Sequence, residues 1–416
     1  MTNAVEEIQL ADLAGLYRDL HAHPELSFSE HRTAGIVAGR LRDLGYQVTS
    51  GIGRTGVVGT LANGPGPTVL LRADMDALPV LEQTGLEYAS TARGTDRDGT
   101  DVPVMHACGH DMHVTCLLGA AAGLADGRDS WHGTLMLVFQ PAEEGGGGAK
   151  AMLDDGLYER FPVPDIVLGQ HVMQLPAGVL GIHPGPAFAA ADELRVVLHG
   201  RGGHGSRPET TVDPILMAAS TVLRLQGVVS REVAADEAAV LTVGALQAGT
   251  RSNIIPDRAE LLVSLRSFDA KVRDRALQAT ERIIRAEAAA SGAPRDPEIT
   301  MTVSFPLLVN DLQACTRLTE LFNGGVGWAL DPGRLTGSED VGLLATAAGA
   351  PLAYWLLGGA DPALFAGVSS VDDARAIVDG LPSNHSPRFA PIIEPTIRTG
   401  VAALTAAARA WLGTTG

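Results

Sequence analysis

The sequence predicts an α/β protein in which a doubly wound, mixed sheet forms the main domain and a smaller α+β domain is inserted into it. Up to about residue 172, apolar strand-like runs alternate with stretches of helical periodicity. Near Pro184 the pattern changes to half-exposed strands, and from Phe305 the first pattern returns. We therefore assign residues 1–185 and 304–416 to the main domain and 186–303 to the insertion.

The N-terminal elements lead to a buried strand that ends in two carboxylates. Leucines at helical spacing predict a helix over 6–20, which Pro24 ends, and a second helix ends near Gly45. Two short strands follow over 48–61, and residues 68–73 form a buried strand that runs into Asp74 and Asp76. Carboxylates at this position lie where open α/β sheets bind ligands, although an aspartate pair can also simply cap a turn.

The stretch from Met105 to His113 contains one thiol, three imidazoles and one carboxylate. This density suggests a metal site. Gly109 allows a tight turn between Cys108 and His110, and the apolar spacing that follows predicts a helix over 110–124. A helix entrance favours a thiolate at Cys108.

Two further strands end in chemically active side chains. The apolar strand over 133–140 is followed by Glu143, Glu144 and four glycines, and the strand over 165–172 ends at His171. Adjacent glutamates at a strand end can diverge, so that one binds metal while the other faces a substrate. The alternative is a solvated loop.

The insertion has the β-α-β-β-α order of a ferredoxin-like domain. We predict strands over 193–199, 239–247 and 258–266 and helices over 213–225 and 270–289. His204 lies between glycines in this region. After it, a strand over 352–357 and a C-terminal helix over 394–412 complete the main domain, with His385 between them.

Composition limits the classes of partner. The formal charge of -17 argues against a nucleic-acid groove or a polybasic membrane surface, so a small solute is expected. The N-terminus lacks the pattern of a signal peptide, and the apolar runs are too short to cross a bilayer. Three cysteines, one of them inside the histidine-rich stretch, suit a reducing cytoplasm better than a disulfide framework.

The strand-end and loop groups form one candidate constellation. Its members are Cys108, His110, Glu143, Glu144, His171 and His385, with Asp74 and Asp76 behind them. Five of these have the chemistry that suits zinc-like ions, which is too many for one tetrahedral site but fits two sites that share a bridging group and a water.

These motifs resemble the M20 metallopeptidase family, in particular its amidohydrolase branch of N-acyl-amino-acid, auxin-conjugate and hippurate hydrolases. The resemblance rests on eight stretches in order along nearly the whole chain. They include Met105-His-Ala-Cys-Gly-His-Asp111, Gln140-Pro-Ala-Glu-Glu-Gly145 and Asn384-His-Ser386, together with residues 21–25, 71–79, 202–205, 252–257 and 337–340.

The resemblance implies two divalent metal ions per subunit, with zinc favoured by the thiolate and manganese, cobalt or nickel as alternatives. The implied ligands are Cys108, His110, Glu144, His171 and His385. It also implies that Glu143 is the general base and that 186–303 is a lid that pairs subunits into a homodimer. A lid histidine matching His204 would stabilise the oxyanion, in the neighbouring subunit's site.

Other roles follow from chemistry. Asp76 is expected to orient a ligand. Asn253 and Arg266 are candidates for binding a substrate carboxylate, with an ion pair inside the lid as the alternative for Arg266. The favoured activity is hydrolysis of N-acyl-amino acids. The alternatives are a dipeptidase or aminopeptidase of the same family, a thiol hydrolase using Cys108, and a non-catalytic metal-binding protein.

Overall fold

The computed structural model describes residues 2–145 and 147–414, and the chain divides into two compact units. The first unit contains Met1–Gly185, Val309–Gly333 and Asp340–Gly416, and the second contains Pro186–Leu308 and Arg334–Glu339. Residues 304–308 and 334–339, which sequence assigned to the main domain, lie in the second unit. The reason is backbone pairing, since Phe305 pairs with Ala191 and Leu335 N donates to Ala187 O at 2.8 Å.

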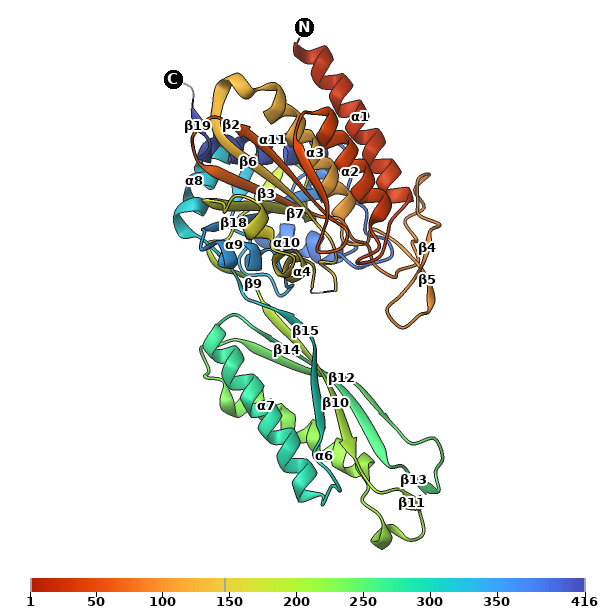
Figure 1. Cartoon of the computed structure of the whole chain (residues 1–416). Helices are drawn as coiled ribbons and strands as arrows, with labels where there is room; N and C mark the ends of the chain where they lie inside the picture. The colour runs from red at the N-terminus through yellow and green to blue at the C-terminus, as the bar shows by residue number, and fades with distance from the viewer. Residues whose placement is uncertain (1, 146, 415–416) are drawn as a thin grey trace. The chain divides into compact units, whose positions relative to one another are not determined.

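The first unit is built on a nine-stranded mixed sheet (Figure 1). The strand order is β1-β2-β6-β3-β7-β18-β8-β17, and β19 pairs with β6. The four central strands β6, β3, β7 and β18 are parallel, whereas β1 and β2 pair antiparallel with their neighbours. β8 pairs antiparallel with β18 and parallel with β17. An α/β fold with a large mixed sheet is therefore confirmed. The strands are β1 (Gln47–Ile52), β2 (Gly56–Asn63), β3 (Thr68–Asp74), β6 (Trp131–Gln140), β7 (Ile166–Pro176), β8 (Val179–Gly181), β17 (Trp328–Leu330), β18 (Leu352–Ala360) and β19 (Gly413–Thr414).

Helices cover this sheet, and the apolar helix α3 (His110–Asp126) is buried on nearly every side. It contacts β3 and β7, and α1 and α11 pack against it. Val69 and Leu71 of β3 belong to the same apolar core, so the alternating residues Leu70 and Arg72 point to the opposite face. The other helices are α1 (Thr2–Ala22), α2 (His31–Asp43), α4 (Gly148–Asp154), α5 (Leu157–Arg160), α8 (Leu312–Asn323), α9 (Gly342–Ala348), α10 (Val371–Gly380) and α11 (Thr396–Trp411).

Short strands that sequence did not predict complete the chain. They include the hairpin β4 (Arg93–Thr95) and β5 (Asp101–Pro103), and also β9 (Gly185–Phe188) and β16 (Leu308–Asn310).

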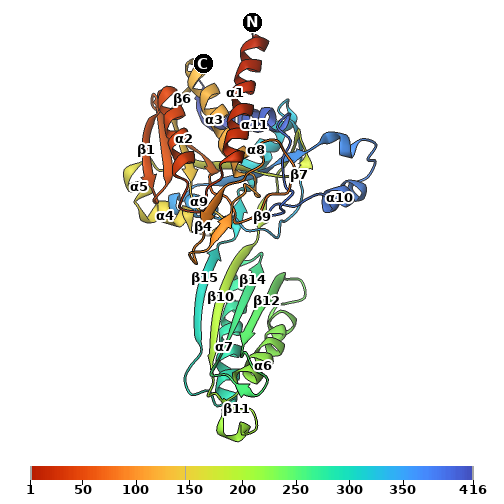
Figure 2. The ribbon, with the colours of Figure 1, turned by 90° about the vertical axis from the view of Figure 1, so that its right-hand side faces the viewer.

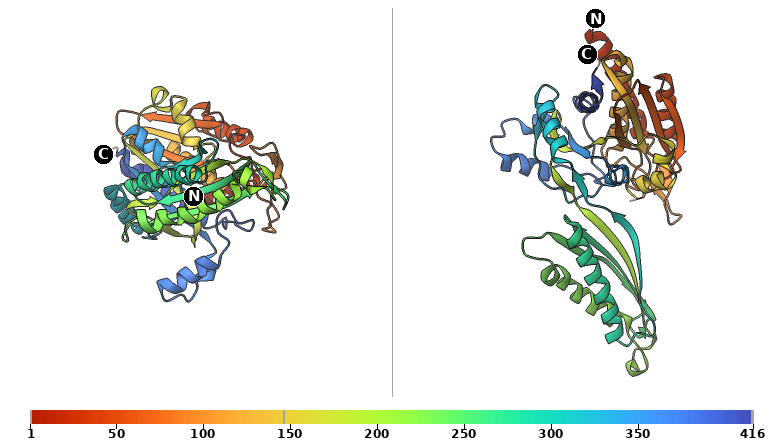
Figure 3. Two further views of the ribbon diagram at one scale, coloured as in Figure 1. Left: turned by 90° about the horizontal axis from the view of Figure 1, so that it is seen from below. Right: turned by 60° about the vertical axis from the view of Figure 1, so that its left-hand side comes forward.

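The second unit is a four-stranded antiparallel sheet with two helices on one face (Figures 2 and 3). Its strand order is β12-β14-β10-β15, and alternate residues such as Leu261, Val263 and Leu265 form a core with the helices. Asp213 and Asp269 cap the two helices by accepting backbone N–H groups. The elements are β10 (Ala190–His199), β11 (Gly203–His204), α6 (Pro214–Gly227), β12 (Ala239–Ala248), β13 (Ile254–Ile255), β14 (Arg258–Ser267), α7 (Ala270–Ala290) and β15 (Glu298–Phe305).

The strand order of the first sheet positions a ligand crevice. After β3 the chain passes through α3 to β6 on one side, and it later returns to β7 on the other side of β3. Such a reversal next to one strand leaves a crevice at the carboxyl ends of the strands. Asp74 and Gln140 are the last residues of β3 and β6, so the groups that follow them meet at this edge.

Among the described residues, no helix has the length and apolar character needed to cross a membrane.

Candidate metal centre

Gly109 turns the chain into α3 and sets the positions of Cys108 and His110. Its φ of 82° is favourable only for glycine, and a Cβ there would lie 2.3 Å from Cγ1 of Val172. The turn brings Cys108 Sγ to 3.5 Å from Nε2 of His171. His171 Nδ1 lies 3.0 Å from the Val172 carbonyl oxygen, and donating to it leaves Nε2 as the ligand atom on the side of Cys108.

Buried carboxylates hold the loop that carries the glutamate pair. Ala142 has a φ of 49°, which is rare outside glycine, and its N–H donates to Glu30 Oε1 at 2.8 Å. The N–H groups of Glu143 and Glu144 donate to the two oxygens of Asp76 at 3.0 and 3.1 Å. Three consecutive backbone donors are thus satisfied by two carboxylates, which fixes both glutamates just beyond β6.

His385 reaches the same place from the C-terminal part of the chain. It has a φ of 70°, and its N–H donates to Ala107 O at 2.8 Å. Its Nε2 lies 3.2 Å from Glu144 Oε2. The preceding Asn384 donates its side-chain amide to Cys108 O at 3.3 Å, so side-chain and backbone contacts both hold this segment. Positive φ values at non-glycine residues concentrate at functional sites.

The potential ligand atoms form two overlapping clusters. Cys108, His110 and His171 make up one cluster, and Cys108, Glu144 and His385 make up the other, with the atoms of each within 4.8 Å of one another. Glu143 forms a third such group with His110 and Glu144. All five predicted ligands and the predicted base therefore meet in the first unit, and Cys108 is common to both clusters.

Unsatisfied polar atoms test whether ions fit these clusters. Nδ1 of His110 lies 3.3 Å from Asp76 Oδ1, whereas its Nε2 and Oε1 of Glu144 are buried without a hydrogen-bond partner. His110 Nε2 lies 3.9 Å from that oxygen. Two donors bonded to one tetrahedral zinc ion are separated by roughly 3.3–3.8 Å, given bond lengths of about 2.0–2.3 Å. The spacings of 3.5 Å between Cys108 and His171 and of 3.2 Å between Glu144 and His385 are close to this range.

The charges of the centre call for cations. Burial alone would lower the pKa of His110, but the charges of Asp74, Asp76 and Glu144 raise it to about 10. Burial, followed by the charges of Glu144 and neighbouring carboxylates, raises the pKa of the Cys108 thiol well above its usual value. Divalent cations would offset this negative potential and favour the thiolate.

A buried network behind the centre includes His113, to which sequence gave no role. Arg72 Nη1 donates to Asp74 Oδ2 at 2.6 Å, and Asp74 Oδ1 lies 2.5 Å from Nδ1 of His113. The third histidine of the motif thus contacts the carboxylate at the end of β3. The density of histidines in the motif was the one sequence signal for a role of His113. Its hydrogen-bond partners could not be predicted, because they depend on how α3 packs against the sheet.

The remaining predicted residues lie in the second unit. His204 is exposed on β11, and Gly205 N donates to Asn253 O at 2.8 Å, so His204 and Asn253 lie at one end of this unit. Arg266 donates to Thr336 O at 2.7 Å and to Ser338 Oγ at 3.2 Å. Both groups are neutral, and the roles of these three residues stay predictions.

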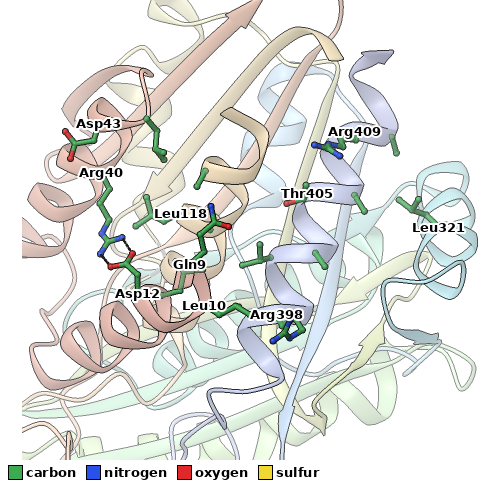
Figure 4. A pocket seen from close by; sticks show the side chains of 18 residues that line it. Gln9, Leu10, Asp12, Arg40, Asp43, Leu118, Leu321, Arg398, Thr405 and Arg409 are labelled. Carbon is green, nitrogen blue, oxygen red and sulfur yellow. Dashed lines mark hydrogen bonds and ion pairs between the residues drawn. The ribbon is translucent and has the colours of Figure 1, made fainter. Parts of the chain in front are cut away.

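A cavity of about 1110 Å³ lies away from this centre, between α1, α3 and α11 (Figure 4). Leu10, Leu118 and several alanines line it, and Arg40 pairs with Asp12 at 2.6 Å within it. None of the candidate ligands contributes to its lining. Cavity volume therefore does not locate the chemistry, which the cluster of ligand atoms locates instead.

Comparison with known proteins identifies the class. Residues 70–409 match the model of peptidase family M20/M25/M40, and the chain belongs to this family. It is 37% identical to thermostable carboxypeptidase 2 of Saccharolobus solfataricus over 82% of this chain and 84% of that protein. It is 40% identical to the hippurate hydrolase of Campylobacter jejuni over 75% and 80% of the two chains. It is also 40% identical to the N-acyl-L-amino acid amidohydrolase of Geobacillus stearothermophilus, over 70% and 75%.

A solved structure agrees with the family and the fold. The Bacillus subtilis YXEP protein, described as a dinuclear metal binding peptidase of the M20 family, matches with a TM-score of 0.75 and 27% identity. The match covers 97% of this chain and 98% of that chain.

Proposed function

We propose that this protein is a dinuclear metal-dependent amidohydrolase that cleaves the amide bond of N-acyl-amino acids. The observation that carries the proposal is the convergence of five ligand side chains and Glu143 in overlapping clusters, in which His385 is the exposed member and Glu144 is partly buried. The names of the relatives, a hippurate hydrolase and an N-acyl-L-amino acid amidohydrolase, support the substrate class.

Cys108, His110 and His171 would hold one ion, and Cys108, Glu144 and His385 the other. Zinc is our first choice because one ligand is a thiolate, and manganese, cobalt or nickel can occupy the same donor set. The ions would supply Lewis acidity that lowers the pKa of a water from about 16 to near 7.

Side chains of the protein then transfer the proton of the water and stabilise the negative charge that develops on the substrate oxygen. Glu143 takes a proton from the attacking water and delivers it to the leaving nitrogen as the C–N bond breaks, so that the acid and the free amine are released. Asp76 holds the backbone of the glutamate pair in place for this transfer. His204 donates to the oxygen that becomes negative, an interaction of the kind worth about 3–4 kcal/mol.

The alternative activities differ in what they need. A dipeptidase or aminopeptidase has to bind a free α-amine with an acidic group, whereas Asn253 and Arg266 suit a carboxylate. A carboxypeptidase activity, as in the name of one relative, also needs a carboxylate partner and is tested with the same substrate panel. A thiol nucleophile at Cys108 conflicts with burial that raises the pKa of that thiol, and complete loss of activity on chelation would exclude it.

The test of the base is Glu143→Gln. This variant should bind two ions normally but hydrolyse N-acyl-amino acids at least about 100-fold more slowly, because loss of a general base typically costs 10²–10⁴ in rate. Glu144→Gln should lose metal as well as activity, and the exposed Glu159→Gln is the matched control. Unchanged turnover by Glu143→Gln would refute the assigned base, and two-ion binding without turnover by the wild type would favour a non-catalytic role.

We also propose that the second unit is a lid that forms a homodimer and that the protein works in the cytoplasm. Leu216 and Leu223 lie two turns apart on α6 and are 68% and 77% exposed, and β12 is the edge strand next to them. His204→Ala should lose activity and regain part of it when mixed with Glu143→Gln, because one site in each mixed dimer would be intact. Absence of complementation would place His204 outside a shared site.

A further inference from the structure

His113 lies next to the metal centre and has a defined partner at each ring nitrogen. The side chain is buried on the first turn of α3, 1% exposed. Its Nδ1 is 2.5 Å from Asp74 Oδ1, and its Nε2 is 2.8 Å from the backbone nitrogen of Val172. A backbone N–H can only donate, so Nε2 accepts and carries no hydrogen. The proton of the neutral ring is therefore on Nδ1 and is donated to Asp74.

Asp74 is held in the form that accepts this bond. Arg72 Nη1 donates to the other carboxylate oxygen at 2.6 Å, and both side chains are fully buried. Because Arg72 holds the charged Asp74 carboxylate from one side, the His113 ring can donate its N–H to that carboxylate in only one orientation.

Val172, at the other end of the imidazole, contacts His171, a ligand in one of the two ion clusters. Its carbonyl oxygen is 3.0 Å from His171 Nδ1, so it sets the ring of the residue before it. The same oxygen accepts the side-chain amide of Asn384 at 3.2 Å, and Asn384 directly precedes His385. The His113 and His171 rings also meet edge to face, with centroids 4.6 Å apart. The Val172 backbone thus depends on His113 for its N–H bond and supports His171 through its carbonyl.

We propose that His113 is a positioning residue for the metal centre: as an Nδ1-protonated imidazole held by Asp74, it fixes Val172 and through it the ligand His171. This inference rests on the proposed function only in the identity of the ligands. Asp74, His110 and His113 are close enough to form a third cation site. That arrangement would require His113 to give up one of its two bonds, so the geometry favours positioning over ligation.

Two substitutions of His113 each remove one of its two hydrogen bonds. In His113→Gln the side-chain oxygen can accept the Val172 N–H, whereas the bond to Asp74 is lost. In His113→Asn the amide can donate to Asp74, whereas the acceptor for Val172 is lost. Loss of an orienting partner of a metal-binding histidine typically weakens metal affinity or activity 10–100-fold. His113→Asn should show this loss for one ion only, and His113→Gln should stay within about fivefold of the wild type.

The measurement is titration of the metal-free, full-length protein with Zn²⁺ in competition with a chromophoric chelator, which resolves the two affinities. His183→Asn is the matched control, because His183 makes a similar bond of 2.8 Å to Asp331 but is more exposed and contributes to neither ion cluster. A merely structural role would lower thermal stability without weakening one ion selectively. Unchanged Zn²⁺ binding by His113→Asn overturns the proposal, and equal loss in both variants supports ligation and overturns it as well.

Neutron diffraction of the wild type gives a check that needs no variant. A deuteron on Nδ1 and none on Nε2 of His113 supports the proposal, whereas a deuteron on Nε2 or an ion bonded to this ring overturns it. Neither measurement uses turnover. A wild type that binds two Zn²⁺ ions but does not hydrolyse N-acyl-amino acids would therefore refute the proposed function and leave the role of His113 standing.

Discussion

Replacing His21 by glutamine should remove a stabilisation that depends on pH. The imidazole is fully buried between two carboxylates, with Nδ1 2.6 Å from Asp111 Oδ2 and Nε2 3.1 Å from Glu82 Oε1. Burial lowers the pKa of His21, but the hydrogen bonds and charges of Asp111 and Glu82 raise it from 6.5 to about 10. The folded state therefore binds a proton that the unfolded chain releases at neutral pH.

The sign and size of the effect follow from these two values. Because the folded pKa is raised, the stabilisation is fully present below pH 6.5 and is lost as the pH rises through about 10. Within this window each pH unit corresponds to at most about 1.4 kcal/mol of unfolding free energy. Between pH 7 and 9 the contribution of His21 should fall by about 2.5 kcal/mol.

The assay is urea unfolding of the metal-free wild type and His21→Gln at pH 7 and pH 9. The free-energy difference between the two proteins should be larger at pH 7 by about 2.5 kcal/mol. His23→Gln is the control, since that side chain is 55% exposed and its partner Asp19 is also in solvent. A difference that does not change between the two pH values would refute the charged state assigned to His21.

Three further substitutions test other features. Asp76→Ala should lower the unfolding free energy by roughly 2–6 kcal/mol in urea, because two buried N–H groups lose their acceptor at about 1–3 kcal/mol each; a loss under 1 kcal/mol would contradict this. Gly109→Ala should cost roughly 1–3 kcal/mol in backbone strain, in addition to the overlap of the new Cβ with Val172, and should lower the number of Zn²⁺ ions bound. An unchanged melting temperature and an unchanged Zn²⁺ stoichiometry would contradict this prediction. Leu216→Asp combined with Leu223→Asp should convert a dimer to a monomer in sedimentation, whereas an unchanged mass would place the interface elsewhere.

Sequence predicted the elements whose patterns are strongest. The run over 68–73 corresponds to β3 and the run over 133–140 to the end of β6, because fully buried parallel strands read as continuous apolar segments. The strand predicted to end at His171 continues to Pro176, since β18 pairs with it beyond that point. The hairpin of β4 and β5 was missed because each strand has three residues and little periodicity.

The candidate site shows the same limit. The motif spacing identified the donors that converge, and strand ends explained why they share one edge of the sheet. The motif spacing did not reveal that Glu30 and Asp76 accept hydrogen bonds from three successive backbone N–H groups, because such contacts depend on the path of the loop. Nor did it predict that 334–339 joins the second unit, since that depends on pairing with a segment far away in sequence.

The order of the ligands along the chain has a consequence for biosynthesis. Cys108, His110 and His171 precede the second unit in sequence, whereas His385 follows it. On the proposed assignment, a nascent chain emerging from the ribosome can present the donors of one ion long before those of the other. Occupancy would then be sequential, and a polypeptide ended prematurely before His385 would be restricted to a single ion.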